Sequence, residues 1–348
     1  MTNAIQAQQR GDYQSAIEAY RAVLKLRPEN VEAKVNLGAA LAHVGKFDEA
    51  ILMYQSALPS LSVKNPVLLN LGLAYYKKGD LVNARRQFES LHQLEPTNVQ
   101  VAILLGDSEV KLGNSERAAS MLQQLEPANS GNPDFEYVLG TAMIKSGHRR
   151  EGVPRVEAAA QAGTSGDAYM LAGATLLELD EYQRARHDLE EALRLDPKLR
   201  GLHTLVGMSR DETGDQAGAE AAFRQAIAEN PDDFKSNLYL GALLYKRRGL
   251  DEAKTYLDRA TKLNPSDIMA RYESAMLKST SGEYESAARE LESVVKDNPD
   301  WLEPHVELAS LYYKLHRPAD GAKERGIVER ITAAQQEKSA GKQPPSPR

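Results

Sequence analysis

The sequence predicts an all-α protein built as a solenoid, in which antiparallel helix pairs stack one after another. Three observations predict this fold class. A pattern of small and apolar residues returns every 34 positions, the apolar residues inside each period follow helical spacing, and no alternating β-strand pattern competes with them. A fixed period of this length indicates repeated supersecondary units rather than separate globular domains.

Small residues mark the period. The phrases NLGAALAHVGKFDEA, from Asn36, and NLGLAYYKKGDLVNA, from Asn70, are near copies. The first small position of the successive periods is occupied by Gly38, Gly72, Gly106, Gly140, Gly173, Gly207, Gly241, Ala275 and Ala309. Twelve positions later a second small residue follows, at Ala50, Ala84, Ala118, Gly152, Ala185, Ala219, Ala253 and Ala287. Four positions after these come large apolar residues, at Tyr54, Phe88, Leu122, Val156, Leu189, Phe223, Leu257 and Leu291.

Each period predicts two amphipathic helices, A and B. Leu71 and Tyr75 lie four positions apart and mark one buried face of a helix A. A glycine such as Gly79 ends helix A, since glycine adopts the left-handed C-cap conformation at little cost. Helix B follows, and a proline such as Pro96 ends the unit because it removes an amide donor. The small residues let the two helices approach closely where they cross.

The residues of the period resemble the tetratricopeptide repeat. The unit from Tyr169 has the matching residues Tyr169, Gly173, Tyr182, Ala185, Leu189, Ala192 and Pro197. The unit from Leu68 has Leu71, Gly72, Tyr75, Gly79, Ala84, Phe88 and Pro96. The resemblance covers residues 1–332, in about nine to ten units. It implies a right-handed superhelix whose A helices line a concave face.

The two ends of the array depart from the pattern. The first unit lacks most of helix A, so we expect the array to begin further upstream in a longer gene product. The last unit, from Asp300, has Pro318 and Gly321 in its second helix and Arg325 at the usual aromatic place, which predicts a polar cap. Residues 333–348 are expected to form a disordered C-terminal tail, because KSAGKQPPSPR is polar and rich in Pro, Ser and Lys.

The resemblance implies that the concave face binds an extended peptide, a helix or a partner protein. The matching positions lie two and one before the leucine of the Leu-Gly pair and two and five after it, and a lysine stripe follows one position later. The candidate peptide-binding residues are Val35, Asn36, Leu69, Asn70, Leu73, Tyr76, Lys77, Ile103, Asp107, Lys111, Tyr137, Lys145, Leu238, Tyr245, Tyr272, Met276 and Tyr313. Apolar and aromatic surface patches favour binding, but side chains at these positions also pack between A helices.

Two polar features of this face have specific interpretations. Asn36 and Asn70 stand where many of these repeats have an asparagine that hydrogen-bonds a ligand backbone, and an amide offers both a donor and an acceptor. Lys77, Lys111 and Lys145 follow one another in consecutive units. They are either solvated residues that complement the helix dipole or they flank an acidic partner segment.

No motif indicates catalysis. The chain has no cysteine, and its seven histidines stand at unrelated repeat positions without metal-ligand spacing. Nucleophile-elbow, phosphate-loop and dinucleotide fingerprints are absent from the sequence. We therefore expect no enzyme activity, no catalytic residues, no metal and no cofactor.

Composition limits the partners. The net charge of -6 argues against nucleic acid, which basic surfaces bind. The sequence has no run of eighteen apolar residues and no signal-peptide pattern, so we expect no membrane insertion. The compartment stays open between the cytoplasm and, if a signal segment was trimmed, the periplasm. The oligomeric state also stays open.

The sequence thus predicts a non-catalytic interaction scaffold, or adaptor, that binds a protein or peptide partner in the groove of its A helices. The alternative is the tetratricopeptide portion of a larger multidomain protein, such as a glycosyltransferase. A coding sequence that ends at these boundaries would exclude the alternative.

We predict a kink or softer joint near residues 147–167. There Gly152 replaces the expected alanine, Pro154 enters helix B, and the glycine-rich link to the next unit is one residue short. Backbone amides in this stretch should exchange with solvent deuterium faster than those of the flanking repeats. Equal protection across all three repeats would contradict the prediction.

Overall fold

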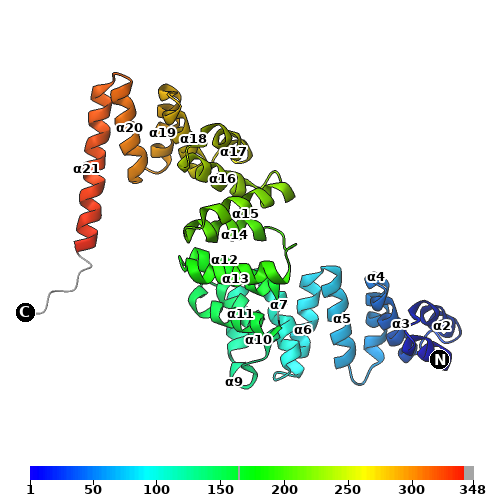
Figure 1. The fold of residues 1–348 in the computed structure, drawn as a ribbon. Helices are drawn as coiled ribbons and strands as arrows, with labels where there is room; N and C mark the ends of the chain where they lie inside the picture. The colour runs from blue at the N-terminus through cyan, green and yellow to red at the C-terminus, as the bar shows by residue number, and fades with distance from the viewer. Residues whose placement is uncertain (164, 341–348) are drawn as a thin grey trace, which may run out of the picture. The chain divides into compact units, whose positions relative to one another are not determined.

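The protein consists of stacked antiparallel helix pairs, which confirms the predicted all-α solenoid class. The structure is a computed structural model that describes residues 1–163 and 165–340, and within these ranges it contains helices and no strand. The chain forms two compact units, Met1–Asp196 and Pro197–Arg348. In each unit the helices follow one another as consecutive pairs (Figure 1).

Unit 1 contains six helix pairs in its described part. These pairs are α1 (Thr2–Gln9) with α2 (Tyr13–Leu26), α3 (Val31–His43) with α4 (Phe47–Ala57), α5 (Asn65–Lys78) with α6 (Leu81–Leu94), α7 (Val99–Lys111) with α8 (Ser115–Gln123), α10 (Pro133–Lys145) with α11 (Arg149–Gly163), and α12 (Gly166–Glu178) with α13 (Tyr182–Leu195). A short 3-10 helix η1 (Leu58–Ser60) and the single-turn α9 (Glu126–Asn129) lie in the links.

Unit 2 contains four helix pairs in its described part. They are α14 (Leu202–Glu212) with α15 (Gln216–Glu229), α16 (Phe234–Lys246) with α17 (Leu250–Leu263), α18 (Ile268–Thr280) with α19 (Tyr284–Asp297), and α20 (Leu302–Lys314) with α21 (Pro318–Ala340). Each pair also contacts the next pair within its unit. The apolar core therefore continues from one repeat to the next.

Short polar residues begin the helices and left-handed residues end helix A. The side chain of Asn98, for example, accepts a hydrogen bond from the backbone N–H of Val101, which satisfies one free donor of α7. Gly79 ends α5 with φ of 86°, as predicted. Asp180, Arg248 and His316 adopt the same conformation without being glycine, with φ of 60°, 65° and 56°.

The small residues sit where helix A crosses helix B, as the pattern predicts. A Cβ atom added to Gly72 would lie 2.5 Å from a ring carbon of Phe88, and one added to Gly207 would lie equally close to Phe223. Both rings are fully buried. In these two repeats the large apolar residue of helix B therefore packs directly onto the backbone of helix A, where no side chain fits.

The repeat formed by α10 and α11 has a closer crossing than this. A Cβ atom on Gly152 would lie 2.6 Å from the carbonyl oxygen of Gly140 and 2.9 Å from the backbone nitrogen of Ile144. Here glycine faces glycine, and backbone meets backbone. The predicted mobility of residues 147–167 stays a prediction, but α11 is one helix from Arg149 to Gly163 and includes Pro154. Residue 164 lies outside the described residues.

Arg155 ties the same repeat together with ion pairs. Its guanidinium donates to Glu136 of α10 at 2.9 Å and to Glu126 of α9. Both carboxylates are at most one-third exposed, so water screens these pairs less than fully exposed ones. Gly152 and Pro154 depart from the repeat pattern in this repeat, and the ion pairs of Arg155 are additional contacts that the pattern does not specify.

The last repeat keeps its packing with unusual residues. Pro318 is the first residue of α21, where a proline loses no helical hydrogen bond. Gly321 lies against the ring of Tyr313, and the Arg325 guanidinium lies 4.8 Å from the centre of that ring. Helix α21 continues to Ala340, beyond the expected end of the array at residue 332. The rest of the expected tail, residues 341–348, lies outside the described residues.

Helix α13 buries a carboxyl group. Asp188 is 4 % exposed, and its Oδ2 atom has no hydrogen-bond partner among the described residues. Burial, followed by the charge of Glu157 and a hydrogen bond with it, raises the pKa of Asp188 to about 7, although Arg184 opposes the shift. Arg184 itself donates to both carboxylate oxygens of Glu157, at 2.8 and 2.9 Å. Asp188 is therefore a buried acid that its own surroundings disfavour when ionised.

Replacing Gly152 with alanine should destabilise the protein, although alanine is the residue that the repeat pattern prefers. The new methyl group would overlap backbone atoms of α10, at an expected cost of roughly 1–3 kcal/mol that exceeds the gain in helix propensity of about 1 kcal/mol. Thermal unfolding followed by circular dichroism measures the change. Gly163→Ala is the matched control, because a Cβ there meets nothing within 4 Å. A stability of Gly152→Ala equal to that of the control would contradict the close crossing.

Replacing Asp188 with asparagine should stabilise the protein above neutral pH. A carboxyl whose folded pKa is raised contributes stability below its unfolded pKa, and this contribution is lost as the pH rises through about 7. We expect a gain on the order of 2 kcal/mol at pH 8, and a smaller gain at pH 5. Urea unfolding at both pH values tests this, with the exposed Asp300→Asn as control. A gain that does not depend on pH would refute the assignment.

Candidate partner-binding site

The predicted binding residues all lie on A helices. In unit 1 they belong to α3, α5, α7 and α10, and in unit 2 they belong to α16, α18 and α20. Most of their side chains are half-buried. Leu238 is only 7 % exposed, so it offers little area to a partner, whereas the three lysines and Tyr313 are exposed. Their role in binding stays a prediction.

Three of the predicted residues form one polar cluster across two repeats. The hydroxyl of Tyr76, on α5, donates a hydrogen bond to Asp107 Oδ2, on α7. The Lys111 ammonium group donates to the same oxygen at 2.8 Å and to the Tyr76 hydroxyl. It also lies 4.7 Å from the centre of the Tyr76 ring. The cluster therefore fixes the Tyr76 ring against the next A helix.

A small pocket of about 100 Å³ adjoins this cluster. Residues of α7 and α10 line it, namely Asp107, Val110, Lys111, Tyr137, Val138, Thr141 and Lys145. Four of these seven are predicted binding residues, and they come from two consecutive repeats. The Thr141 hydroxyl donates to the carbonyl oxygen of Tyr137 at 2.6 Å. The pocket therefore combines a tyrosine, two valines and charged groups in one small depression.

Burial and neighbouring charges set the protonation of this site. Burial raises the pKa of Tyr76, and its hydrogen bond to Asp107 raises it further. The pKa of Tyr137 is also raised, first by burial and then by the charges of Asp167 and Asp107. For Lys111, burial lowers the pKa, but hydrogen bonds to Asp107 and Tyr76 outweigh it and the net shift is upward. Both tyrosines stay neutral and Lys111 stays charged at neutral pH.

The predicted asparagines differ from this cluster. Asn36 lies close to the hydroxyl of Tyr20 on α2, which donates a hydrogen bond to Gln8 Oε1 at 2.8 Å. The pKa of Tyr20 is raised mainly by burial and next by the charge of Glu32, and the nearby Asn36 side chain opposes the rise. The Asn36 amide thus faces helix B of the preceding repeat. Asn70 is half-buried on α5.

In unit 2 the predicted tyrosines make separate contacts. Tyr272 packs against Trp301 with ring centres 4.7 Å apart, and its pKa is raised to about 12, mainly by burial. The hydroxyls of Tyr245 and Thr280 hydrogen-bond at 2.9 Å, and Tyr313 is covered by Arg325. Trp301 was not predicted. It lies directly before α20, at a position for which the repeat pattern specifies no residue type. Its aromatic character next to a helix A was the one sequence feature that could have indicated a contact.

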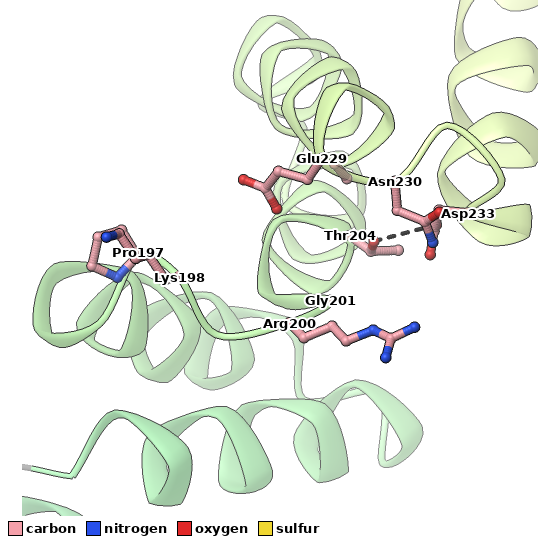
Figure 2. A pocket seen from close by; sticks show the side chains of 9 residues that line it. Pro197, Lys198, Arg200, Gly201, Thr204, Glu229, Asn230 and Asp233 are labelled. Atoms are coloured by element: carbon pink, nitrogen blue, oxygen red, sulfur yellow. Dashed lines mark hydrogen bonds between the residues drawn. The ribbon is translucent and has the colours of Figure 1, made fainter.

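A pocket with a volume of about 610 Å³ lies in unit 2 at positions that are not among the predicted binding residues (Figure 2). Its lining includes Lys198, Arg200, Glu229 and Asp233, so charges of both signs face it. Thr204 lies against Asp233, 3.4 Å from a carboxylate oxygen. Part of the lining is the loop from Pro197 to Gly201, where the repeat pattern specifies only the proline, so the pattern gives no signal for the rest. The balanced charges favour no particular ligand.

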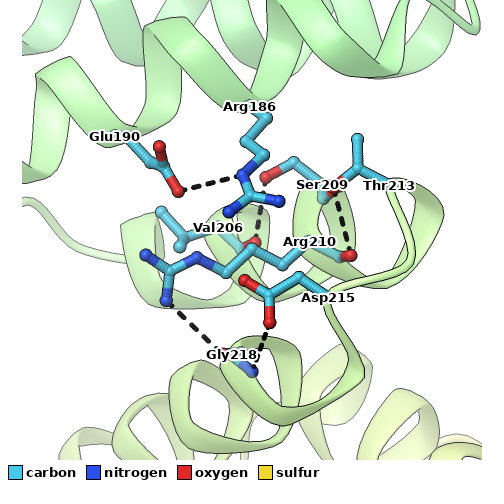
Figure 3. A network of polar contacts seen from close by, with 8 residues as sticks. All are labelled: Arg186, Glu190, Val206, Ser209, Arg210, Thr213, Asp215 and Gly218. Carbon is cyan, nitrogen blue, oxygen red and sulfur yellow. Dashed lines mark hydrogen bonds and ion pairs between the residues drawn. The ribbon is translucent and has the colours of Figure 1, made fainter.

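The polar groups near the start of α15 serve the fold (Figure 3). Asp215 caps α15 by accepting from the backbone N–H of Gly218 at 2.9 Å, and the Thr213 hydroxyl donates to the carbonyl of Ser209 at 2.9 Å. In unit 1, Arg186 pairs with Glu190 one helical turn further along α13. These contacts are local to their helices and helix ends, and they indicate no binding site.

No helix within residues 1–163 and 165–340 is long and apolar enough to cross a membrane. In the same ranges, no group of three or more His, Asp or Glu side chains is arranged to hold a metal ion.

Sequence models described as tetratricopeptide repeat match this chain in four stretches. They cover residues 1–63, 75–142, 166–199 and 212–278. Together these stretches include most of the chain.

Three curated proteins illustrate the relatives. The Protein CTR9 homolog of Arabidopsis thaliana is 34% identical over 92 residues, which are 26% of this chain and 8% of that protein. Anaphase-promoting complex subunit 3 of Schizosaccharomyces pombe is 22% identical over 274 residues, which are 78% of this chain and 41% of that protein. The TPR repeat-containing thioredoxin TTL4 of Arabidopsis thaliana is 28% identical over 100 residues, 29% of this chain and 15% of that protein. The chain spans less than half the length of each.

Solved structures share the fold. The APC/C hetero-tetramer Cut9-Hcn1 matches with a TM-score of 0.54 at 12% identity, over 95% of this chain and 80% of that chain. PilF of Pseudomonas aeruginosa matches with a TM-score of 0.52 at 20% identity, over 61% of this chain and 96% of that chain. At these identities the likeness concerns the fold alone.

Proposed function

This chain belongs to the tetratricopeptide repeat family, and from this premise we propose that it is a non-catalytic scaffold that binds a protein or peptide partner on its A helices. The single observation that carries the proposal is the convergence of predicted binding residues in unit 1. Tyr76, Asp107, Lys111, Tyr137 and Lys145 were selected by repeat position, and together they form or adjoin one pocket.

The chemistry of this surface suits protein recognition. Tyrosine combines a large apolar area with a polar hydroxyl, and tyrosines are enriched among the residues that carry most of the energy of protein interfaces. Hydrogen bonds to Asp107 and Lys111 hold the Tyr76 ring in place before any partner arrives, so less side-chain entropy is lost on binding. Half-buried Leu69, Leu73 and Ile103 on the same helices add apolar area.

The relatives agree with a role in assemblies. Two of the similar proteins are named as parts of the anaphase-promoting complex, which supports an interaction role by analogy of fold. A second candidate is that these repeats form the binding part of a longer polypeptide, because one relative is named as a thioredoxin that contains such repeats. The full-length coding sequence separates the two candidates.

Affinity capture tests the proposed surface. Immobilised wild-type protein should retain a partner from a lysate of its source. The double variant Tyr76→Ala/Tyr137→Ala should retain about tenfold less of that partner, because it lacks two ring contacts. Mass spectrometry identifies and quantifies the partner. Leu26→Ala/Leu94→Ala is the matched control, since these side chains are 86% and 60% exposed on B helices.

Circular dichroism of both double variants should give the wild-type helical content, so that lost binding is not lost folding. A partner that remains bound to the tyrosine variant but is lost by the leucine control would place the binding surface on the B helices. Capture of no specific partner by the wild-type protein counts against the scaffold proposal.

A further inference from the structure

We infer that the pocket between α7 and α10 receives a carboxylate side chain from the partner, that is, a glutamate or aspartate of an extended segment. The inference rests on the scaffold function proposed above and names the chemistry of the segment. It depends on three properties of the pocket: its size, its charge and the groups on its wall.

The size of the pocket limits what enters it. The pocket volume of about 100 Å³ is the volume that roughly three water molecules occupy in liquid water. One short side chain fits this space, whereas an indole ring or a folded element does not. The pocket therefore accommodates a single residue of a partner, and the rest of the segment lies on the surrounding A helices.

The charges on the wall select an anion. Asp107 is already paired with Lys111, which donates to it at 2.8 Å, and it also accepts from Tyr76. Lys145 lines the same pocket and has neither a hydrogen bond nor an ion pair with any residue that the structure describes. The lining thus has two ammonium groups and one carboxylate. An entering cation would meet both ammonium groups, and an entering carboxylate would pair with Lys145.

The remaining groups suit the other parts of an acidic side chain. Val110 and Val138 offer apolar contacts for its methylene groups, and Tyr137 forms part of the wall. Asp167 is close enough to raise the pKa of Tyr137 but does not line the pocket. Its charge weakens the attraction for an anion without occupying the site.

The equivalent lysines of unit 2 are in different surroundings and serve for comparison. Lys314 lies over the ring of Tyr284, 4.9 Å from its centre. Lys246 is near the half-buried carboxyl of Glu273, whose raised pKa results mainly from partial burial and is opposed by the charge of Lys246. Lys246 shares the repeat position of Lys145, so it provides a matched control for substitution.

Fluorescence anisotropy with defined peptides tests the inference. The probes are end-capped, fluorescein-labelled nonapeptides of alternating alanine and serine with glutamate, glutamine or lysine at the fifth position. We expect the glutamate probe to bind the full chain about fivefold more tightly than the glutamine probe at low ionic strength, and the lysine probe to bind most weakly. Lys145→Gln should remove the preference for glutamate, and Lys246→Gln should retain it.

Equal affinities of the glutamate and glutamine probes for the wild-type chain would overturn the inference, as would an unchanged preference in Lys145→Gln or no binding of the glutamate probe at millimolar concentration. Its failure is distinguishable from failure of the scaffold proposal. A partner captured through Tyr76 and Tyr137, but bound equally well by Lys145→Gln, refutes the carboxylate pocket alone. Absence of any partner at the tyrosines refutes the scaffold.

Discussion

The crossing of helix A and helix B at small residues is the contact on which the rest of the structure depends. At Gly72 the ring of Phe88 rests on bare backbone, and at Gly207 the ring of Phe223 does the same. Such contacts bring two helices closer than side chains on both would allow. They also use one face of helix A completely, so that its other faces are available to the next repeat and to the surface.

Contacts in each unit join only near neighbours along the chain, which has consequences for the site. The Tyr76 cluster needs α5 and α7, and the pocket needs α7 and α10, so three consecutive repeats are sufficient to build both. Each repeat adds its own side chains at the same helical positions, and the surface can change character from one repeat to the next. Lysine recurs at one position in five repeats, but among these lysines only Lys111 forms an ion pair with an aspartate on its own helix in the described part of the chain.

Sequence periodicity predicted the helix pairs, the left-handed glycine at the end of helix A and the small residues at the crossings, because each of these is a backbone requirement that few residue types satisfy. It did not predict the left-handed Asp180, Arg248 and His316, since a polar residue at a helix end gives no comparable signal. From the sequence, Gly152 was one reason to predict a kink or softer joint near residues 147–167. In the structure this glycine faces Gly140, a pairing visible only when two helices are placed together.

In the candidate site, too, the sequence predicted some features and missed others. Repeat position correctly placed Tyr76, Asp107 and Lys111 on A helices, but it could not predict that they bond to each other, because this depends on side-chain rotamers and on the distance between repeats. The lining of the 610 Å³ pocket in unit 2 comes partly from residues 198–201, for which the repeat pattern specifies no residue type. Trp301 escaped notice for a similar reason. It is the single tryptophan of the chain and it packs on Tyr272, so the tryptophan emission of this protein originates at one aromatic contact, an optical reporter that needs no label.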